Sequence, residues 1–123
     1  MNNVSANLDL DLALDLDARI LCAHNQLRRA ERDLALLLAE MEDTRRYLEL
    51  GYASVYDYAR TRLDLEPRKT RGLIRIGRAL PEMPCIDQAM ASGALCWTKA
   101  RELLSVVTFV TKRVAFVTRI DIR

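Results

Sequence analysis

The residues best suited to chemistry in this sequence are arginines that recur between residues 67 and 80. Four of them follow one another at steps of three and four: Arg68, Arg71, Arg75 and Arg78. On a helix they fall within about 80° of one another, nearly opposite an apolar stripe that contains Leu73. A guanidinium group can donate two parallel hydrogen bonds to a phosphate, or to O6 and N7 of guanine. We call these four residues the arginine face, and their pattern predicts a surface that contacts nucleic acid.

The elements that must position this face have the layout of a helix-turn-helix. Ser54 is a typical N-cap for a short helix over residues 55–62, the letters LDLE predict a turn, and Pro67 suits the first position of a second helix. In helix-turn-helix proteins the second helix presents its side chains to the major groove of DNA. Three further bases are candidates for phosphate contacts: Lys69, Lys99 and Arg101.

A second interpretation of the same segment is an ordinary helical hairpin with a solvated polar face. In that case the arginines could also pair with acids of the chain itself. The candidate partners are the acids towards the end of the long helix and just after it: Glu40, Glu42, Asp43 and Glu49. Such pairing would neutralise the predicted surface.

No set of residues in the sequence assembles an active site. His24 is the only histidine, so neither a pair of metal-binding histidines nor a histidine base with its nucleophile can be completed in the usual form. Cys22, Cys85 and Cys96 are odd in number and lack CxxC spacing, which favours reduced thiols in the cytoplasm, expected here as small core residues. We therefore expect no enzyme activity, no cofactor, no metal and no small-molecule substrate.

Composition indicates one helical domain. The chain has 123 residues, of which 50% are hydrophobic and 29% charged, with a formal net charge of +2. Residues 67–123 carry eleven bases and four acids, whereas residues 1–17 carry four acids and no base. A basic half of this kind favours an anionic partner such as DNA. No apolar run approaches the roughly 18 residues that a membrane span needs, and no basic region followed by an apolar stretch opens the chain.

The hydrophobic period predicts an all-α fold. We expect a flexible acidic N-terminus over residues 1–14 and a helical domain over residues 15–107. Within that domain a long helix covers residues 15–46, the helix-turn-helix-like segment covers residues 54–80, and two further helices cover residues 84–107. Residues 108–123 form an atypical tail, irregular or with a local preference for strand.

The long helix carries apolar residues at alternating steps of four and three from Leu16 onward. Ile20, Leu27, Leu34 and Met41 lie on this line, which we call the seam. A seam sustained over more than three heptads predicts a coiled-coil or dimer interface, so homodimerisation or docking to another protein is the alternative function. Additional apolar residues beside the seam are equally typical of ordinary core packing.

Residues 45–108 carry several motifs of a known family. They are GYAS at Gly51 to Ser54, the arginine-rich segment leading into RALPEMP, and GAL followed by TKARELL. This stretch resembles the helical N-terminal domain that precedes the nuclease module in bacterial HNH endonuclease proteins, and the likeness extends back to about Leu16. RALPEMP with GAL and KARELL also resembles the helices after the helix-turn-helix in chromosome-partition DNA-binding proteins. Both resemblances imply association with DNA.

The sequence departs from the HNH family in two places. Cys96 stands where the family usually offers a serine that caps the next helix, and the pattern is lost after Thr108. The family's nuclease core uses two histidines and an asparagine, which cannot be placed on a chain whose single histidine is His24. The resemblance therefore implies a truncated or frameshifted relative without catalysis of its own, or an enzyme fragment that needs an HNH partner.

Overall fold

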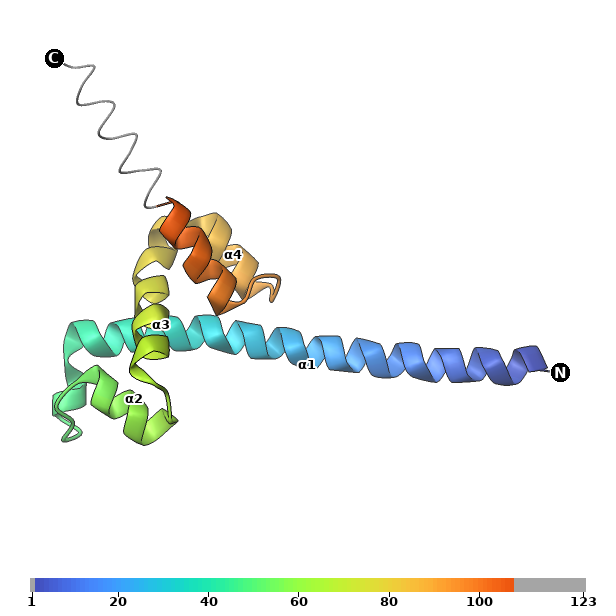
Figure 1. Cartoon of the computed structure of the whole chain (residues 1–123), viewed down its shortest axis with the longest axis horizontal. Helices are drawn as coiled ribbons and strands as arrows, with labels where there is room; N and C mark the ends of the chain where they lie inside the picture. Colours follow the sequence, from blue (N-terminus) through green and yellow to red (C-terminus); the bar gives the residue numbers. More distant parts are fainter. Residues whose placement is uncertain (1, 108–123) are drawn as a thin grey trace, which may run out of the picture.

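The computed structural model describes residues 2–107, and every regular element among them is helical (Figure 1). The elements are α1 (Asn2–Thr44), the 3₁₀ turn η1 (Arg46–Leu48), α2 (Val55–Leu63), α3 (Pro67–Ala79), the 3₁₀ turn η2 (Leu80–Glu82) and α4 (Pro84–Ala91). A last helix covers residues 97–107. The predicted all-α fold is confirmed: a long first helix is followed by four shorter helices that pack against it. The predicted tail over residues 108–123 lies outside the described residues.

The prediction of a flexible N-terminus over residues 1–14 was wrong. Helix α1 begins at Asn2 and has 43 residues, about 65 Å at 1.5 Å per residue. The alternating LDLDLALDLD segment continues this helix instead of forming a strand. Leucine and alanine are strong helix formers, and extending an existing helix adds one hydrogen bond for each residue that becomes ordered. The helix ends at Thr44 because Arg45 adopts a left-handed conformation with φ of 57°.

Local capping explains the boundaries of the next two helices. The hydroxyl of Ser54 accepts a hydrogen bond from the amide of Asp57 at 3.0 Å, and the Asp57 carboxylate accepts one from the amide of Ala53 at 3.3 Å. The arrangement is similar to a capping box, except that the second amide belongs to Ala53, the residue before the cap, and not to Ser54 itself. Helix α2 ends at Leu63 because Asp64, which follows it, has a left-handed φ of 55°, and Pro67 starts α3. The predicted cap, turn and proline start are confirmed.

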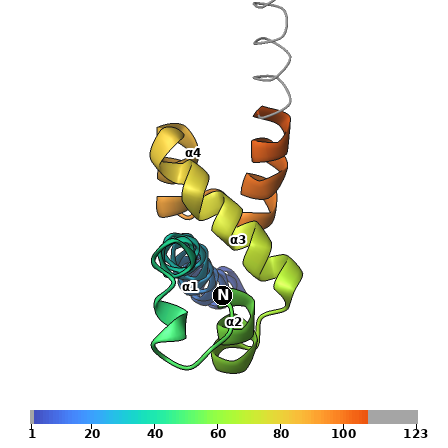
Figure 2. The same cartoon turned by 90° about the vertical axis from the view of Figure 1, so that its left-hand side faces the viewer.

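The core lies where α3 crosses α1. Figure 2 looks along α1 and shows α3 crossing it, with α2 at one end of α3 and α4 at the other. The residues that are almost fully buried come from α1, α2, α3, η2, α4 and the last helix: Ala35, Leu38, Ala39, Val55, Ala59, Leu73, Ile74, Ile76, Leu80, Met90, Ala100 and Leu104. The predicted apolar stripe of α3 is therefore the centre of the core.

Candidate nucleic-acid interface

The arginine face lies on the outside of α3. Arg68, Arg71, Arg75 and Arg78 are exposed, while the side of α3 that contains Leu73 and Ile76 is buried. Exposed and buried positions alternate with the helical period. Only one narrow side of α3 is therefore exposed to solvent, and that side is basic. The structure thus presents these four side chains together at the surface.

Two glycines hold α3 close to its neighbours. A Cβ built on Gly77 would collide with the carbonyl group of Ala35 in α1, and would lie 2.9 Å from the Cβ of Ala39. A Cβ built on Gly72 would lie 3.2 Å from Cζ3 of Trp97 in the last helix. Close approach on both sides fixes the rotation of α3 about its axis, and with it the direction of the arginine face.

Trp97 brings two of the other predicted bases together. Nζ of Lys69 lies 5.4 Å from a ring centroid of Trp97, and Cζ of Arg101 lies 5.3 Å from one. Each distance is within the range of a cation–π interaction. Lys69 from α3 and Arg101 from the last helix therefore share one aromatic side chain. This extends the basic surface from α3 onto residues 97–107.

A second aromatic contact orients the arginine face itself. Cζ of Arg71 lies 5.8 Å from the ring centroid of Tyr56 in α2. The contact reduces the freedom of a long side chain that is otherwise exposed. Sequence reasoning did not identify Trp97 or Tyr56 as part of this surface, because each role depends on how helices distant in sequence pack.

Two of the predicted contact residues have acidic partners. Nη2 of Arg78 lies 2.8 Å from Oδ1 of Asp43 and 3.5 Å from Oε2 of Glu42, both on α1. The hydrogen bond that Arg78 donates to Asp43 raises the pKa of the Arg78 guanidinium above its ordinary value, with a smaller contribution from the charge of Glu42. Nζ of Lys99 lies 3.5 Å from Oε2 of Glu102 one helical turn away.

The remaining arginines of this face are not neutralised in the same way. The ion pairs among residues 2–107 involve none of Arg68, Arg71 and Arg75. The sequence left open that the whole arginine face pairs with acids of the same chain. Among residues 2–107 this pairing is present for Arg78 alone. Three exposed arginines, together with Lys69 and Arg101, make up the surface that we call the basic face from here on.

Three neighbouring polar residues of α1 attach the second half of the domain. Nη1 of Arg28 donates to the carbonyl oxygen of Gly93 at 3.0 Å, and the Glu31 carboxylate accepts from the amide of Trp97 at 3.3 Å. Glu31 thus accepts a hydrogen bond from the first amide of the last helix. The residue before this amide is Cys96, where the family that the chain resembles usually has a capping serine.

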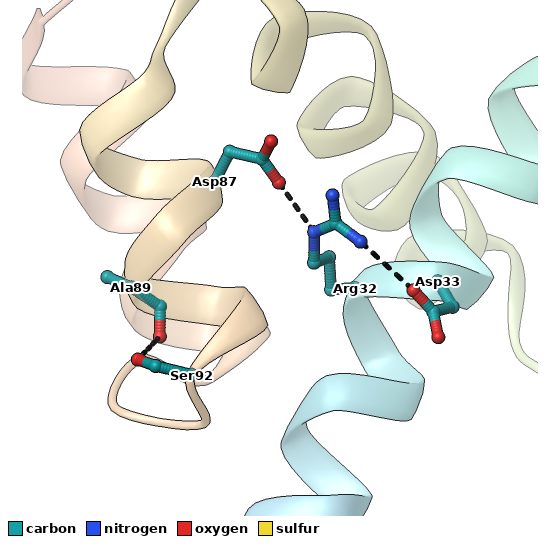
Figure 3. Close-up of polar contacts among 5 residues, drawn as sticks. All are labelled: Arg32, Asp33, Asp87, Ala89 and Ser92. Atoms are coloured by element: carbon teal, nitrogen blue, oxygen red, sulfur yellow. Dashed lines mark hydrogen bonds and ion pairs between the residues drawn. The ribbon is translucent and has the colours of Figure 1, made fainter.

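Arg32 completes this attachment on α4. Its Nε donates to Oδ1 of Asp87 at 2.5 Å, and its Nη1 lies 3.1 Å from Oδ1 of Asp33 (Figure 3). The hydrogen bond to Asp87 is the largest cause of a raised pKa at Arg32. The same view shows Ser92 donating from its hydroxyl to the carbonyl of Ala89, which closes the end of α4. Arg32 thus holds α4 against α1, and the sequence pattern did not predict this contact.

The predicted dimer seam divides into two parts. Ile20 and Leu27 are exposed by 58% and 60%. Leu34 and Met41 are half-buried and pack against the core of the same chain. The prediction of one continuous dimer seam was wrong for Leu34 and Met41. Helices α2 and α3 pack against this part of α1, so both side chains contact the core of their own chain.

The histidine and the three cysteines lie on α1, on α4 and just before the last helix. His24 and Cys22 are exposed on α1, Cys85 is exposed on α4, and Cys96 is half-buried. The expectation that the cysteines are core residues was therefore wrong for Cys22 and Cys85. Within residues 2–107, no three or more histidine, cysteine, aspartate and glutamate side chains gather as a metal site would require. In the same part of the chain, no helix has both the length and the apolar character needed to cross a bilayer.

Comparison of the chain with protein-family models, with curated proteins and with solved structures finds no match. The resemblance to the N-terminal domain of HNH endonuclease proteins therefore stays a prediction.

Proposed function

We propose that this chain is a non-catalytic, DNA-associating helical domain, related to the N-terminal region of HNH endonuclease proteins. The observation that carries the proposal is the basic face: Arg68, Arg71 and Arg75 exposed on one side of α3, beside Lys69 and Arg101 on Trp97.

A helix such as α3 can enter the major groove of a duplex, which is roughly 12 Å wide. Arg68 and Arg75 are seven residues apart, so the exposed row extends about 10 Å along the helix axis. If α3 does not enter the groove, the same row of arginines can lie along the phosphates at the edge of the groove. Guanidinium groups suit either position because their planar fork matches phosphate and guanine.

The aromatic contacts support binding in a second way. Lys69, Arg71 and Arg101 each lie over an aromatic ring, which limits the conformations of their side chains before any ligand arrives. Ordering a long side chain on binding costs about 0.5–1.5 kcal/mol, so a partly ordered base loses less when it binds a phosphate. The basic face is thus partly preorganised.

The test is fluorescence anisotropy of labelled duplex DNA titrated with the purified chain at low salt. We compare the Arg71→Ala/Arg75→Ala variant with a matched control, Arg46→Ala/Arg62→Ala, which removes the same charge from exposed positions on η1 and α2. The proposal expects tight binding by the unchanged chain, at least tenfold weaker binding by the first variant, and a much smaller loss in the control. Equal losses of affinity in the two variants would show that DNA is attracted to the net charge of the chain and not to this face, which would contradict the proposal. Absence of binding by the unchanged chain would also contradict it.

Catalysis is tested separately. The chain incubated with supercoiled plasmid and Mg²⁺ is expected to leave the plasmid intact, because the HNH residues of the family it resembles have no counterpart at His24. Nicking by the purified chain that is lost in the His24→Ala variant would contradict the non-catalytic assignment.

A further inference from the structure

The N-terminal half of α1 projects from the bundle without a partner among residues 2–107 (Figure 1). Every side chain from residue 3 to residue 24 is exposed, and the first residue of α1 against the bundle is Asn25, which lies beside Gly93. The projection is about 35 Å long at 1.5 Å per residue. Because most helices in proteins depend on packing of an apolar face, a helix of this length is expected to have a partner.

The free part of the seam begins in the projecting segment and ends at Leu27, just beyond it. Leu16 is 53% exposed, Ile20 58% and Leu27 60%, and Ala23 between them is also exposed. At 100° per residue these four positions lie within about 60° of one another. A contiguous exposed apolar stripe of this kind is typical of an interaction surface.

Charge along the same helix indicates which partner fits. Residues 2–17 contain four aspartates and no base, and residues 18–30 contain three arginines and no acid. Asp9, Asp11, Asp15 and Asp17 form the acidic part. Arg19 and Arg29 form the exposed basic part, since Arg28 donates to Gly93 of the bundle. A second copy running in the opposite direction sets each acidic part against a basic part. A second copy running in the same direction sets acid against acid, which destabilises pairing.

We propose that the chain forms a homodimer through antiparallel pairing of this projecting segment, packed along Leu16, Ile20 and Ala23. The pairing is centred near residue 18, where the sign of the charge changes, so that Leu16 of one copy packs beside Ile20 of the other. Such an interface is twofold symmetric and self-complementary, as most homodimer interfaces are. It uses residues outside the basic face and does not rest on DNA binding.

The first test is the mass of the full chain by sedimentation, without DNA, over two decades of concentration. The proposal expects the mass to rise from the 14.1 kDa of one chain towards twice that value. A chain that stays monomeric at every concentration overturns the proposal, whether the seam is then covered by another protein or by another part of this chain.

Two variants locate the interface. Leu16→Glu/Ile20→Glu changes the free seam, and Leu14→Glu/Leu21→Glu changes two leucines of similar exposure on nearly the opposite side of the same segment. None of the four residues lies in the bundle, and unfolding followed by Trp97 fluorescence verifies that the bundle is intact in both. We expect dimerisation at least tenfold weaker in the seam variant and nearly unchanged in the control. The reverse order overturns the assignment of the seam.

A distance measurement tests the orientation. With the three cysteines replaced by serine and Ser5→Cys carrying a spin label, the antiparallel dimer places the two labels about 40 Å apart, twice the distance along the helix from residue 5 to residue 18. Parallel pairing places them about 10 Å apart, the usual separation of packed helix axes. The shorter distance would overturn the antiparallel arrangement.

Discussion

Gly77 of α3 packs directly on the backbone of Ala35 in α1. A Cβ at residue 77 would lie 2.7 Å from the carbonyl carbon of Ala35 and 2.9 Å from the Cβ of Ala39, and it would overlap the Ala35 carbonyl oxygen. The two helices meet here through their main chains, and both flanking α1 residues are alanines that are almost fully buried. This crossing fixes the arginine face on the outside of α3.

The crossing predicts a large effect for one glycine-to-alanine substitution in α3 and a small effect for another. Gly77→Ala must push the helix backbones apart and is expected to lower the free energy of unfolding by about 1–3 kcal/mol. Gly72→Ala meets side-chain atoms only, with Cζ3 of Trp97 at 3.2 Å and Cδ of Arg101 at 3.5 Å. Since alanine favours a helix over glycine by about 1 kcal/mol, its net effect should stay within about 1 kcal/mol.

Urea unfolding followed by circular dichroism measures both variants. Equal effects, or stabilisation by Gly77→Ala, would contradict the close approach of α3 to α1.

Local signals in the sequence predicted much of the fold. The cap at Ser54 and the proline at residue 67 set helix starts through neighbouring atoms, so α2 and α3 could be placed to within about one residue. The arginine face was predictable for the same reason, since it depends only on helical spacing.

Contacts between distant helices could not be predicted. The Trp97 amide donates a hydrogen bond to Glu31, and Arg78 pairs with Asp43. Both contacts exist because α1 passes close to α3 and to residues 97–107. The start of α1 was misplaced because alternation of leucine and aspartate has the period of a strand, while the structure continues the helix that follows it.

Glu31 is expected to stabilise the last helix from outside it. Its carboxylate accepts from the amide of Trp97 at 3.3 Å, at the end of the helix where a negative charge is favourable. Glu31→Ala should cost about 1 kcal/mol, within the range observed for lost N-caps, and Glu31→Gln should cost less because an acceptor remains. Hydrogen exchange at the Trp97 amide should accelerate in the alanine variant.

Cys96→Ser supplies the cap that this helix lacks. The serine hydroxyl can accept from an amide of the first turn, so the substitution should recover about 0.5–1 kcal/mol in the Glu31→Ala background. Urea unfolding compares Glu31→Ala with Glu31→Ala/Cys96→Ser. An equal free energy of unfolding in the two variants would show that residue 96 is not the N-cap.

The pairing of Arg78 with Asp43 is expected to limit its contact with DNA. Both side chains are more than half exposed, so the pair contributes little to stability, roughly 0–1 kcal/mol. Asp43→Asn should therefore leave the fold intact, free Arg78 and strengthen binding to duplex DNA more than Glu49→Gln, which removes the same charge from an exposed position elsewhere. Equal gains from the two variants in an anisotropy titration would contradict a specific restraint on Arg78.

Trp97 is the only tryptophan of the chain and lies within the basic face. Withdrawal of Lys69 or Arg101 from its ring towards phosphate should change its emission. Titration with unlabelled duplex DNA is thus expected to give a fluorescence change with the same midpoint as the anisotropy curve. DNA binding without any change in Trp97 emission would exclude the last helix from the interface.

The central claim is that Arg71 and Arg75 contact DNA phosphates, and the most direct test is the salt dependence of binding. Each phosphate contact contributes about −0.9 to the slope of log affinity against log salt on duplex DNA. The Arg71→Ala/Arg75→Ala variant should therefore show a slope that is shallower by about 1.8, while the Arg46→Ala/Arg62→Ala control keeps the slope of the unchanged chain. Identical slopes in all three proteins would contradict the assignment of DNA binding to α3.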